Sequence, residues 1–193
     1  VYERQGAVWA ESQLDKPVLA DGAHFGGAVA IDGDRLLAGA HEDADGGSAF
    51  VYEILDGVWT QTARLVGPGV DNGVFGDAIA LQGDVAVVGD LHVDNYTGEA
   101  YVFRFDGAAW ERIATLTASD RFGRDYFGAS VALDGERIVV GAWGNDDNGS
   151  HAGSAYVFER EGGAWVETAK LVPSDPDRFL FFGKSVALEG DRI

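Results

Sequence analysis

The sequence contains no cysteine, only 4 prolines, and 14 basic residues against 32 acidic ones. The lack of cysteine excludes disulfide bonds, thiolate catalysis and cysteine-based zinc sites. The net charge of −18 disfavours nucleic acid and anionic membranes as partners, because phosphate binding needs a basic surface. No apolar run is long enough to span a bilayer and no signal-peptide pattern is present, so we expect no membrane insertion. A start at Val1 indicates a processed or excised chain.

What the sequence does contain is a repeat. The dipeptide Phe-Gly recurs with spacings of 50, 52 and 55 residues, at Phe25, Phe75, Phe127 and Phe182. Four tryptophans keep step with it, at Trp9, Trp59, Trp110 and Trp165. A period of this length predicts an array of similar structural units. We divide the chain into three full units with a half unit at each end, over residues 1–24, 25–74, 75–126, 127–181 and 182–193.

Each full unit reads as four β-strands. The first strand starts at Phe-Gly ("FGASVAL"), and a tight turn such as "DGER" leads to the second ("IVVGA"). The third strand reads "SAYVFER" and the fourth starts at tryptophan ("WVETAKL"). Asp-Gly between apolar runs is a strong hairpin signal, and no segment has a sustained helical period. We therefore predict an all-β fold, a β-propeller of four-stranded antiparallel blades. A stacked β-solenoid is the structural alternative.

Only two of the four intervals in a unit vary in length. The distance from Phe to the Gly of the second strand is 14 in all three full units, and from the third-strand Val to Trp it is 8 in all four copies. The distance from that Gly to the next Val is 12, 13 or 16, and from Trp to the next Phe 16 or 17. In an up-and-down sheet the second turn and the inter-blade link share one end. We expect this variable face to bind ligands; tolerance of insertions is the alternative explanation.

The pattern "FGASVALDGERIVVGA" followed by "GSAYVFE" and Trp resembles the FG-GAP repeat, the blade unit of the integrin alpha-chain propeller, in its bacterial form. The resemblance covers the whole chain. It implies an extracellular or cell-surface location, a role in adhesion or ligand binding, and a ligand face built from second-turn loops and inter-blade links. Integrin blades often have a calcium-binding loop between the first two strands, and we do not expect that loop in this chain. That turn is only "DGDR" here, and Asp32 and Asp34 alone cannot surround Ca²⁺ with six to eight oxygens.

The candidate ligand-binding residues lie in the variable loops and links. They are His41, Glu42, Asp43, Asp45, His92, Asp94, Asn95, Tyr96, Tyr126, Trp143, Asn145, Asp146, Asp147 and Asn148. Asp43, Asp45, Asp94, Asp146 and Asp147 are candidate ligands of weakly bound Ca²⁺, with solvated turn residues as the alternative. The pairs His41/Asp43 and His92/Asp94 each resemble half of a transition-metal site, or a coincidence. Tyr96, Tyr126 and Trp143 suit sugar stacking, whereas the tryptophans in fixed register are expected to pack between blades.

Three functions follow as hypotheses. The first is a non-enzymatic adhesion or binding module for a protein or glycan. The second is a structural spacer or self-assembly unit. The third is a polysaccharide hydrolase or lyase that uses the acidic loops. Evidence for it would be catalytic turnover that is lost when Asp146 or Asp147 is replaced by alanine. The sequence has no Ser-His-Asp order and no phosphate-binding glycine loop. The terminal half units, "VYERQGAVWAESQL" and "FGKSVALEGDRI", indicate a segment of a longer propeller or a ring completed by another copy.

Overall fold

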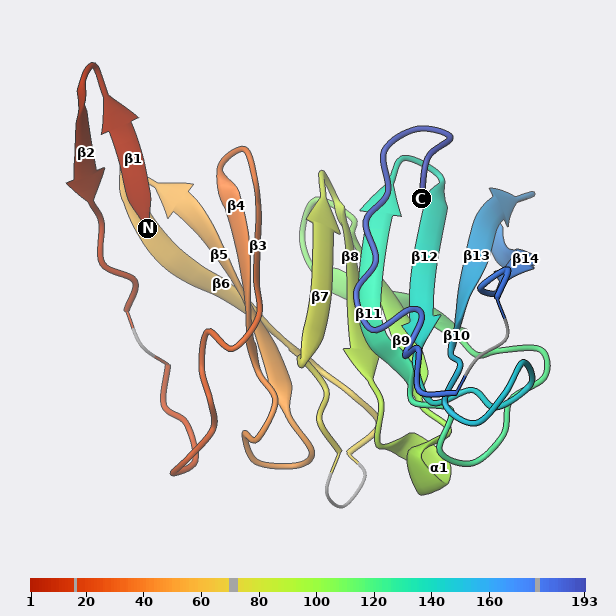
Figure 1. Ribbon diagram of the computed structural model, residues 1–193. Coiled ribbons are helices and arrows are strands. Elements are labelled where there is room, and N and C mark those ends of the chain that lie inside the picture. Colours follow the sequence, from red (N-terminus) through yellow and green to blue (C-terminus); the bar gives the residue numbers. More distant parts are fainter. Residues whose placement is uncertain (16, 70–72, 176–177) are drawn as a thin grey trace.

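The chain forms three four-stranded antiparallel sheets and one two-stranded hairpin (Figure 1). The computed structural model describes residues 1–15, 17–69, 73–175 and 178–193. The hairpin pairs β1 (Tyr2–Gln5) with β2 (Val8–Glu11). The first sheet is β3 (Val29–Asp32), β4 (Arg35–Ala40), β5 (Ser48–Leu55) and β6 (Val58–Val66). The second is β7 (Ala78–Gln82), β8 (Val85–Asp90), β9 (Glu99–Phe105) and β10 (Trp110–Leu116). The third is β11 (Phe127–Asp134), β12 (Arg137–Ala142), β13 (Ser154–Glu161) and β14 (Ala164–Leu171).

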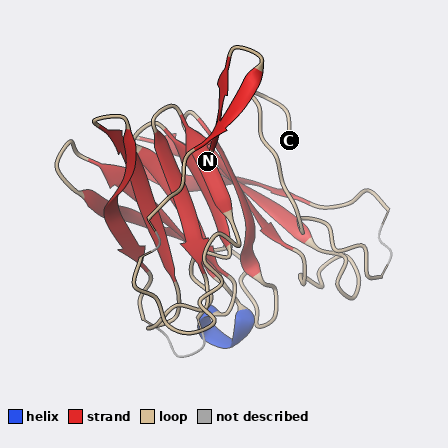
Figure 2. Ribbon diagram, turned by 90° about the vertical axis from the view of Figure 1, so that its left-hand side faces the viewer, coloured by secondary structure: helices blue, strands red, loops and turns tan. Residues whose placement is uncertain are grey.

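Each sheet pairs its strands in chain order, as the predicted propeller blade requires. The one helical element among the described residues, α1 (Val93–Tyr96), is a single turn in the loop between β8 and β9, and Asp94 and Asn95 within it have positive φ. Figure 2 shows α1 at one end of the sheets and the β1–β2 hairpin projecting at the other. Among the described residues, no helix has the length and apolarity to cross a bilayer.

The core consists of layers between neighbouring sheets. Alternate residues of a strand point to opposite faces, so Leu37 of β4 packs toward the second sheet while Leu36 and Ala38 pack toward the N-terminal hairpin. Phe75, Val88 and Tyr101 of the second sheet share the layer of Leu37. Because both faces are covered, the second and third strands are apolar on nearly every residue.

The Phe-Gly dipeptide joins one blade to the next through its backbone. The Phe75 N–H donates to the carbonyl of Gly46 at 3.0 Å, and the Phe127 N–H donates to that of Thr97 at the same distance. A Cβ on Gly89 would lie 2.0 Å from the carbonyl oxygen of Gly128. The glycine of the second strand is therefore required because the next blade's Phe-Gly backbone occupies the space of a side chain.

The short turns form the opposite end of the sheets, which we call the fixed rim, and they clamp neighbouring blades. The Asp32 carboxylate accepts from the Gly83 N–H at 2.6 Å, and Arg35 Nη1 donates to the Gly83 carbonyl at 2.7 Å and to Asp84 at 2.9 Å. Arg35 Nε also donates to Glu53 at 2.7 Å. The same contacts recur between the third blade and the C-terminal segment. The residues are Asp134, Arg137, Glu159, Gly190 and Asp191. The constant turn length thus reflects a contact between blades.

The variable intervals lie together at one end, as predicted. The loop between the second and third strands of each blade runs beside the link to the next blade. The Tyr126 N–H donates to the carbonyl of Tyr96 at 2.9 Å, and the Phe181 N–H donates to that of His151 at 3.0 Å. We call this end the variable rim; it comprises loops 41–47, 91–98 and 143–153 and the links beside them, at the bottom of Figure 1.

Two expectations about the repeats are wrong. Residues 182–188 form no strand; they make a single bridge, between Gly153 and Phe182, and Val186 and Leu188 pack on the third sheet. A strand needs a ladder of partners for its backbone, and this segment has none among the described residues. Trp9 is 63% exposed rather than packed, whereas the equivalent Trp59 is buried.

Candidate functional site

Two positions flanking the repeat motifs meet on the variable rim. One residue precedes Phe-Gly and the other follows the Gly-Ala or Gly-Asp of the second strand. In the third blade these residues are Tyr126 and Trp143, whose rings stack with centroids 4.1 Å apart and planes 7° from parallel. In the first blade they are His24 and His41, with centroids 5.0 Å apart. The fold therefore brings these two side chains together in the first and third blades, and the sequence gives each pair a different chemistry.

Aromatic rings extend from the Tyr126–Trp143 stack in both directions along the rim. Tyr96 lies 5.7 Å from Tyr126 between centroids and 4.8 Å from His92. On the other side Trp143 lies 6.2 Å from His151, which stacks on Phe179 at 5.7 Å. We call this series the aromatic run: His92, Tyr96, Tyr126, Trp143, His151, Phe179 and Phe181. It links loops of the second and third blades to the C-terminal link.

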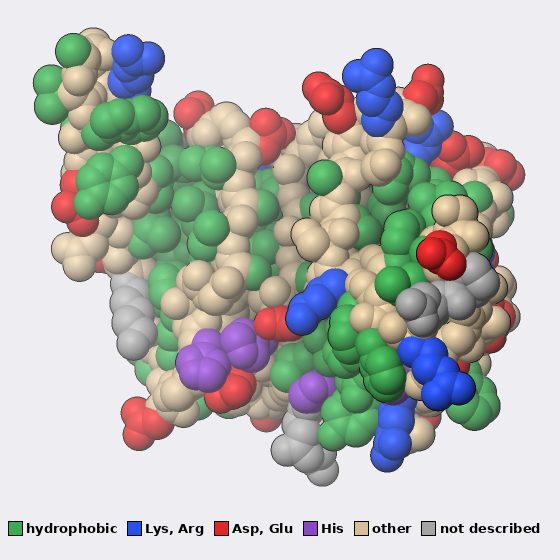
Figure 3. Space-filling view, in the orientation of Figure 1, with side chains coloured by type: hydrophobic (Ala, Val, Ile, Leu, Met, Phe, Trp, Pro, Cys, Tyr) green, Lys and Arg blue, Asp and Glu red, His purple; other side chains and the backbone are tan. Residues whose placement is uncertain are grey.

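The outer members of the aromatic run are open to solvent, but its centre is not. Tyr96 is 41% exposed and Phe179 is 60% exposed. Hydrophobic side chains are visible on this side of the molecule in Figure 3. Trp143 is half-buried; Tyr126 stacks on one face of its ring, and the rings of His151 and Phe181 lie 6.2 and 5.7 Å away between centroids. Tyr96, Tyr126 and Trp143 thus come together as one site, and the face of Trp143 that Tyr126 covers is not free to stack on a sugar.

Asp43 holds its own loop together. Its side chain is buried and accepts hydrogen bonds from the Ala20 N–H at 3.1 Å, the Ser48 hydroxyl at 2.9 Å and Arg64 at 2.8 Å. Although burial disfavours the charged form, these hydrogen bonds and the Arg64 charge hold the pKa of Asp43 below its usual value. We therefore assign Asp43 to the internal structure of the rim and remove it from the candidate ligand-binding surface.

Asn145 and its neighbours repeat this arrangement in the third blade. Asn145 is buried and accepts from the Ser154 hydroxyl at 2.9 Å and from Lys170 Nζ at 3.2 Å. Lys170 also pairs with Asp147 at 2.5 Å and with Asp120 at 2.6 Å. Although burial favours the neutral amine, these two carboxylates raise the pKa of Lys170. Asn145 and Asp147 are thus already engaged within the protein.

The remaining acidic candidates are spread along the rim. Asp94 is exposed and pairs with Arg121 at 3.2 Å. Asp146 is exposed and accepts from the His151 N–H at 2.7 Å. Asp45 is exposed, and Asn95 and Asn148 meet the neighbouring links through backbone or amide contacts. In the part of the chain that the structure describes, the one group of three or more His, Asp or Glu side chains with converging donor atoms is His24, His41 and Glu42. None of the five candidate calcium ligands belongs to it.

The four copies of the repeat match one protein family. A family model of the FG-GAP repeat matches residues 15–52, 59–103, 110–158 and 165–193. The chain belongs to the FG-GAP repeat family. Three of the FG-GAP matches begin at a blade tryptophan, namely Trp59, Trp110 and Trp165. The first two of these span the outer strand of one blade and the inner strands of the next, and the third spans most of β14 and the C-terminal segment. Among curated proteins, none matches the chain.

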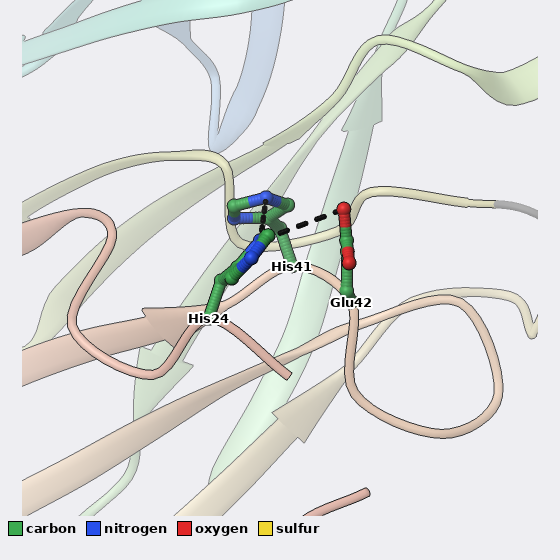
Figure 4. A group of neighbouring side chains, drawn as sticks. All are labelled: His24, His41 and Glu42. Atoms are coloured by element: carbon green, nitrogen blue, oxygen red, sulfur yellow. Dashed lines mark hydrogen bonds and ion pairs between the residues drawn. The ribbon is translucent and has the colours of Figure 1, made fainter. Parts of the chain in front are cut away.

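The FG-GAP register could have revealed the residue that sequence reasoning missed. His24 precedes Phe25-Gly as Tyr126 precedes Phe127-Gly, and His41 follows Gly39-Ala as Trp143 follows Gly141-Ala. The sequence-based pairing of His41 with Asp43 is wrong, because the two side chains point in different directions. Asp43 points inward to Ser48, whereas His41 meets His24 and Glu42 on the surface (Figure 4).

Proposed function

We propose that this FG-GAP propeller segment is a non-enzymatic binding module of an extracellular or cell-surface protein, and that it binds its ligand through the variable rim. The observation that carries the proposal is the aromatic run, which brings rings from two loops and two links to one surface. Tyr96, Phe179 and Phe181 expose more than a third of their surface there. Exposed apolar groups gathered on one face are typical of interaction sites.

The geometry favours a protein ligand over a glycan. Sugar binding usually needs a free flat ring face, and one face of Trp143, the largest ring of the aromatic run, is already covered by Tyr126. The rings that the aromatic run exposes to solvent are mainly its outer members, Tyr96 and Phe179. This mixed apolar and polar surface suits a protein interface. The chain's net charge of −18 further favours a partner with a basic surface around the apolar contact.

A non-enzymatic role is supported by how the rim's carboxylates are used. Asp43 is held by Ser48 and Arg64, and Asp147 shares Lys170 with Asp120. A general acid or base must be free to exchange a proton with a substrate, and these groups are bound to cations and hydroxyls of the protein itself. A hydrolase built on the acidic loops therefore has little support.

The proposal is tested by substitutions in the aromatic run against matched substitutions on the fixed rim. Tyr96→Asn and Phe179→Asn remove exposed rings and keep a residue that tolerates the positive φ of both positions. Leu55→Asn and Val58→Asn are the controls, since both side chains are exposed at a fixed-rim turn. The probes are a glycan array and a panel of purified surface and matrix proteins. We expect a protein ligand whose affinity falls at least tenfold in the rim variants and is unchanged in the controls.

The spacer or self-assembly hypothesis makes the opposite forecast in the same assays. It expects no binder on either panel, and ordered polymers in light scattering and electron microscopy. The terminal segments give it one point of support, because the N-terminal segment packs on the first sheet and the C-terminal segment packs on the third. Absence of any binder together with polymers would replace the binding proposal.

A further inference from the structure

The first blade places two imidazoles and a carboxylate on the variable rim. His24 comes from the link before β3, and His41 and Glu42 follow β4. His24 Nδ1 lies 3.2 Å from His41 Nε2 and 3.5 Å from Glu42 Oε1. Figure 4 shows the three side chains turned toward one another, and Figure 3 shows histidine beside an acidic side chain at the surface.

These separations fit the edges of a metal coordination shell. A tetrahedral ion with ligands at ~2.0–2.1 Å sets neighbouring donor atoms about 3.3 Å apart. The two measured separations, 3.2 and 3.5 Å, are close to that value, and all three donor atoms lie within 4.8 Å of one another. Two imidazole nitrogens with one carboxylate oxygen form a donor set that suits Zn²⁺ and related ions better than Ca²⁺.

A second observation comes from the other nitrogen of His41. Among the described residues, His41 Nδ1 is buried without a hydrogen-bond partner, and an acidic atom, Asp77 Oδ1, lies 3.6 Å away. Metal-binding histidines commonly direct their second ring N–H at a carboxylate, which fixes the tautomer and leaves the first nitrogen free to coordinate. Asp77 belongs to the start of the second blade, so it faces His41 from across the blade boundary.

We propose that His24 Nδ1, His41 Nε2 and Glu42 Oε1 bind one divalent transition-metal ion, with Asp77 as the positioning residue behind His41. The site is open, because His24 and Glu42 are exposed, and water completes the coordination. Binding requires His24 Nδ1 to give up any proton that it shares with His41 in the metal-free protein. This site is separate from the aromatic run, so it does not depend on the proposed ligand.

The test is calorimetric titration of chelator-treated protein with Zn²⁺, followed by Co²⁺ substitution. We expect one tight site per chain, and intense visible absorption bands from four-coordinate Co²⁺. His24→Asn and His41→Ala are expected to weaken binding at least tenfold. The matched control is His151→Asn, since His24 and His151 have the same φ of 52° and both lie on the rim. Asp77→Asn should weaken binding about tenfold without changing the melting temperature of the metal-free protein.

Folding defects are separated from metal loss by Glu42→Gln, a change at an exposed side chain. Zn²⁺ should raise the Tm of the wild-type protein and raise that of Glu42→Gln less, since a bound ligand stabilises the folded state. Three outcomes would overturn the proposal: no stoichiometric Zn²⁺ binding, wild-type affinity in both His24→Asn and His41→Ala, or an equal loss in His151→Asn.

Discussion

The indole ring of Trp143 stacks on the phenol ring of Tyr126, with centroids 4.1 Å apart. The two residues are 17 apart in the chain, and they meet because each borders a repeat motif that the blade fixes in place. The same two positions in the first blade hold His24 and His41. An invariant scaffold therefore presents an aromatic pair in one blade and a potential metal-binding pair in another.

Neighbouring blades approach closely at the glycine of the second strand. We therefore expect a single added methyl group at this glycine to lower the stability of the fold strongly. Gly89→Ala would place a Cβ 2.0 Å from the Gly128 carbonyl oxygen, so we expect about 3 kcal/mol of destabilisation or more. Gly107→Ala is the control, because its turn is open and only its φ of +98° opposes a side chain. It should cost about 1 kcal/mol. Urea denaturation measures both, and equal losses would contradict the packing argument.

The fixed-rim clamp predicts that Arg35 cannot be replaced by lysine. Its guanidinium contacts Glu53, Asp84 and the Gly83 carbonyl at once, and a lysine ammonium cannot reproduce this planar, multiple contact. We expect Arg35→Lys to lower the free energy of unfolding by about 1 kcal/mol. Arg4→Lys, in the exposed N-terminal hairpin, should have almost no effect. A neutral result at Arg35 would show that the clamp does not stabilise the blade interface.

Asp43 predicts a distinct acid limb in the stability curve. Its folded pKa is lowered, so the unfolded state binds more protons as the pH falls. The stabilisation is fully present above the unfolded pKa of about 3.9 and is lost as the pH falls through the folded pKa. Asp43→Asn should flatten this limb.

At neutral pH, Asp43→Ala should cost about 1–3 kcal/mol because it leaves Ser48 and Arg64 without their buried acceptor. Asp43→Asn keeps an acceptor and should cost less, since the third blade uses Asn145 at this place. Denaturation of both variants across pH 2–7 tests the argument, and an acid limb unchanged in Asp43→Asn would contradict it.

Asp90 is expected to change stability with pH in the opposite direction to Asp43. It is buried, its Oδ2 has no hydrogen-bond partner in the part of the chain that the structure describes, and it pairs with Glu99 across the ladder. Burial and the nearby Glu99 charge raise its pKa, so stability falls as the pH rises from the unfolded pKa of about 3.9 through the folded one. We expect Asp90→Asn to be more stable than the wild type at pH 7 by about 1 kcal/mol. The gain should disappear in acid, and destabilisation at pH 7 would contradict the assignment.

The sequence predicted the blades and the rim because both depend on local signals that repeat. Asp-Gly turns, apolar runs and constant intervals specify hairpins, and the variable intervals specify one end. The start of the first strand was less predictable. β3 begins at Val29 and β7 at Ala78 rather than at Phe25 and Phe75, whereas β11 begins at Phe127 as predicted.

The site was predictable by location but less so by orientation. Tyr96, Tyr126 and Trp143 were placed on the correct rim, where the structure brings them into contact. The direction of Asp43 and Asn145 depends on Ser48 and Ser154, which lie one strand away and bond to them. The pairs Asp43/Ser48 and Asn145/Ser154 occupy equivalent positions of the repeat, and comparing them in the sequence could have indicated that Asp43 and Asn145 point inward. His24 was missed because its partner lies 17 residues away.

The claim that the variable rim is the binding surface is tested most directly by fluorotryptophan NMR. The chain has five tryptophans, and Trp143 belongs to the aromatic run while Trp59, Trp110 and Trp165 pack between blades. The probe is the strongest binder from the glycan array or protein panel. The account predicts that this binder shifts the Trp143 resonance and leaves those of Trp59, Trp110 and Trp165 in place. A shift confined to the other tryptophans, with Trp143 unmoved, would contradict it.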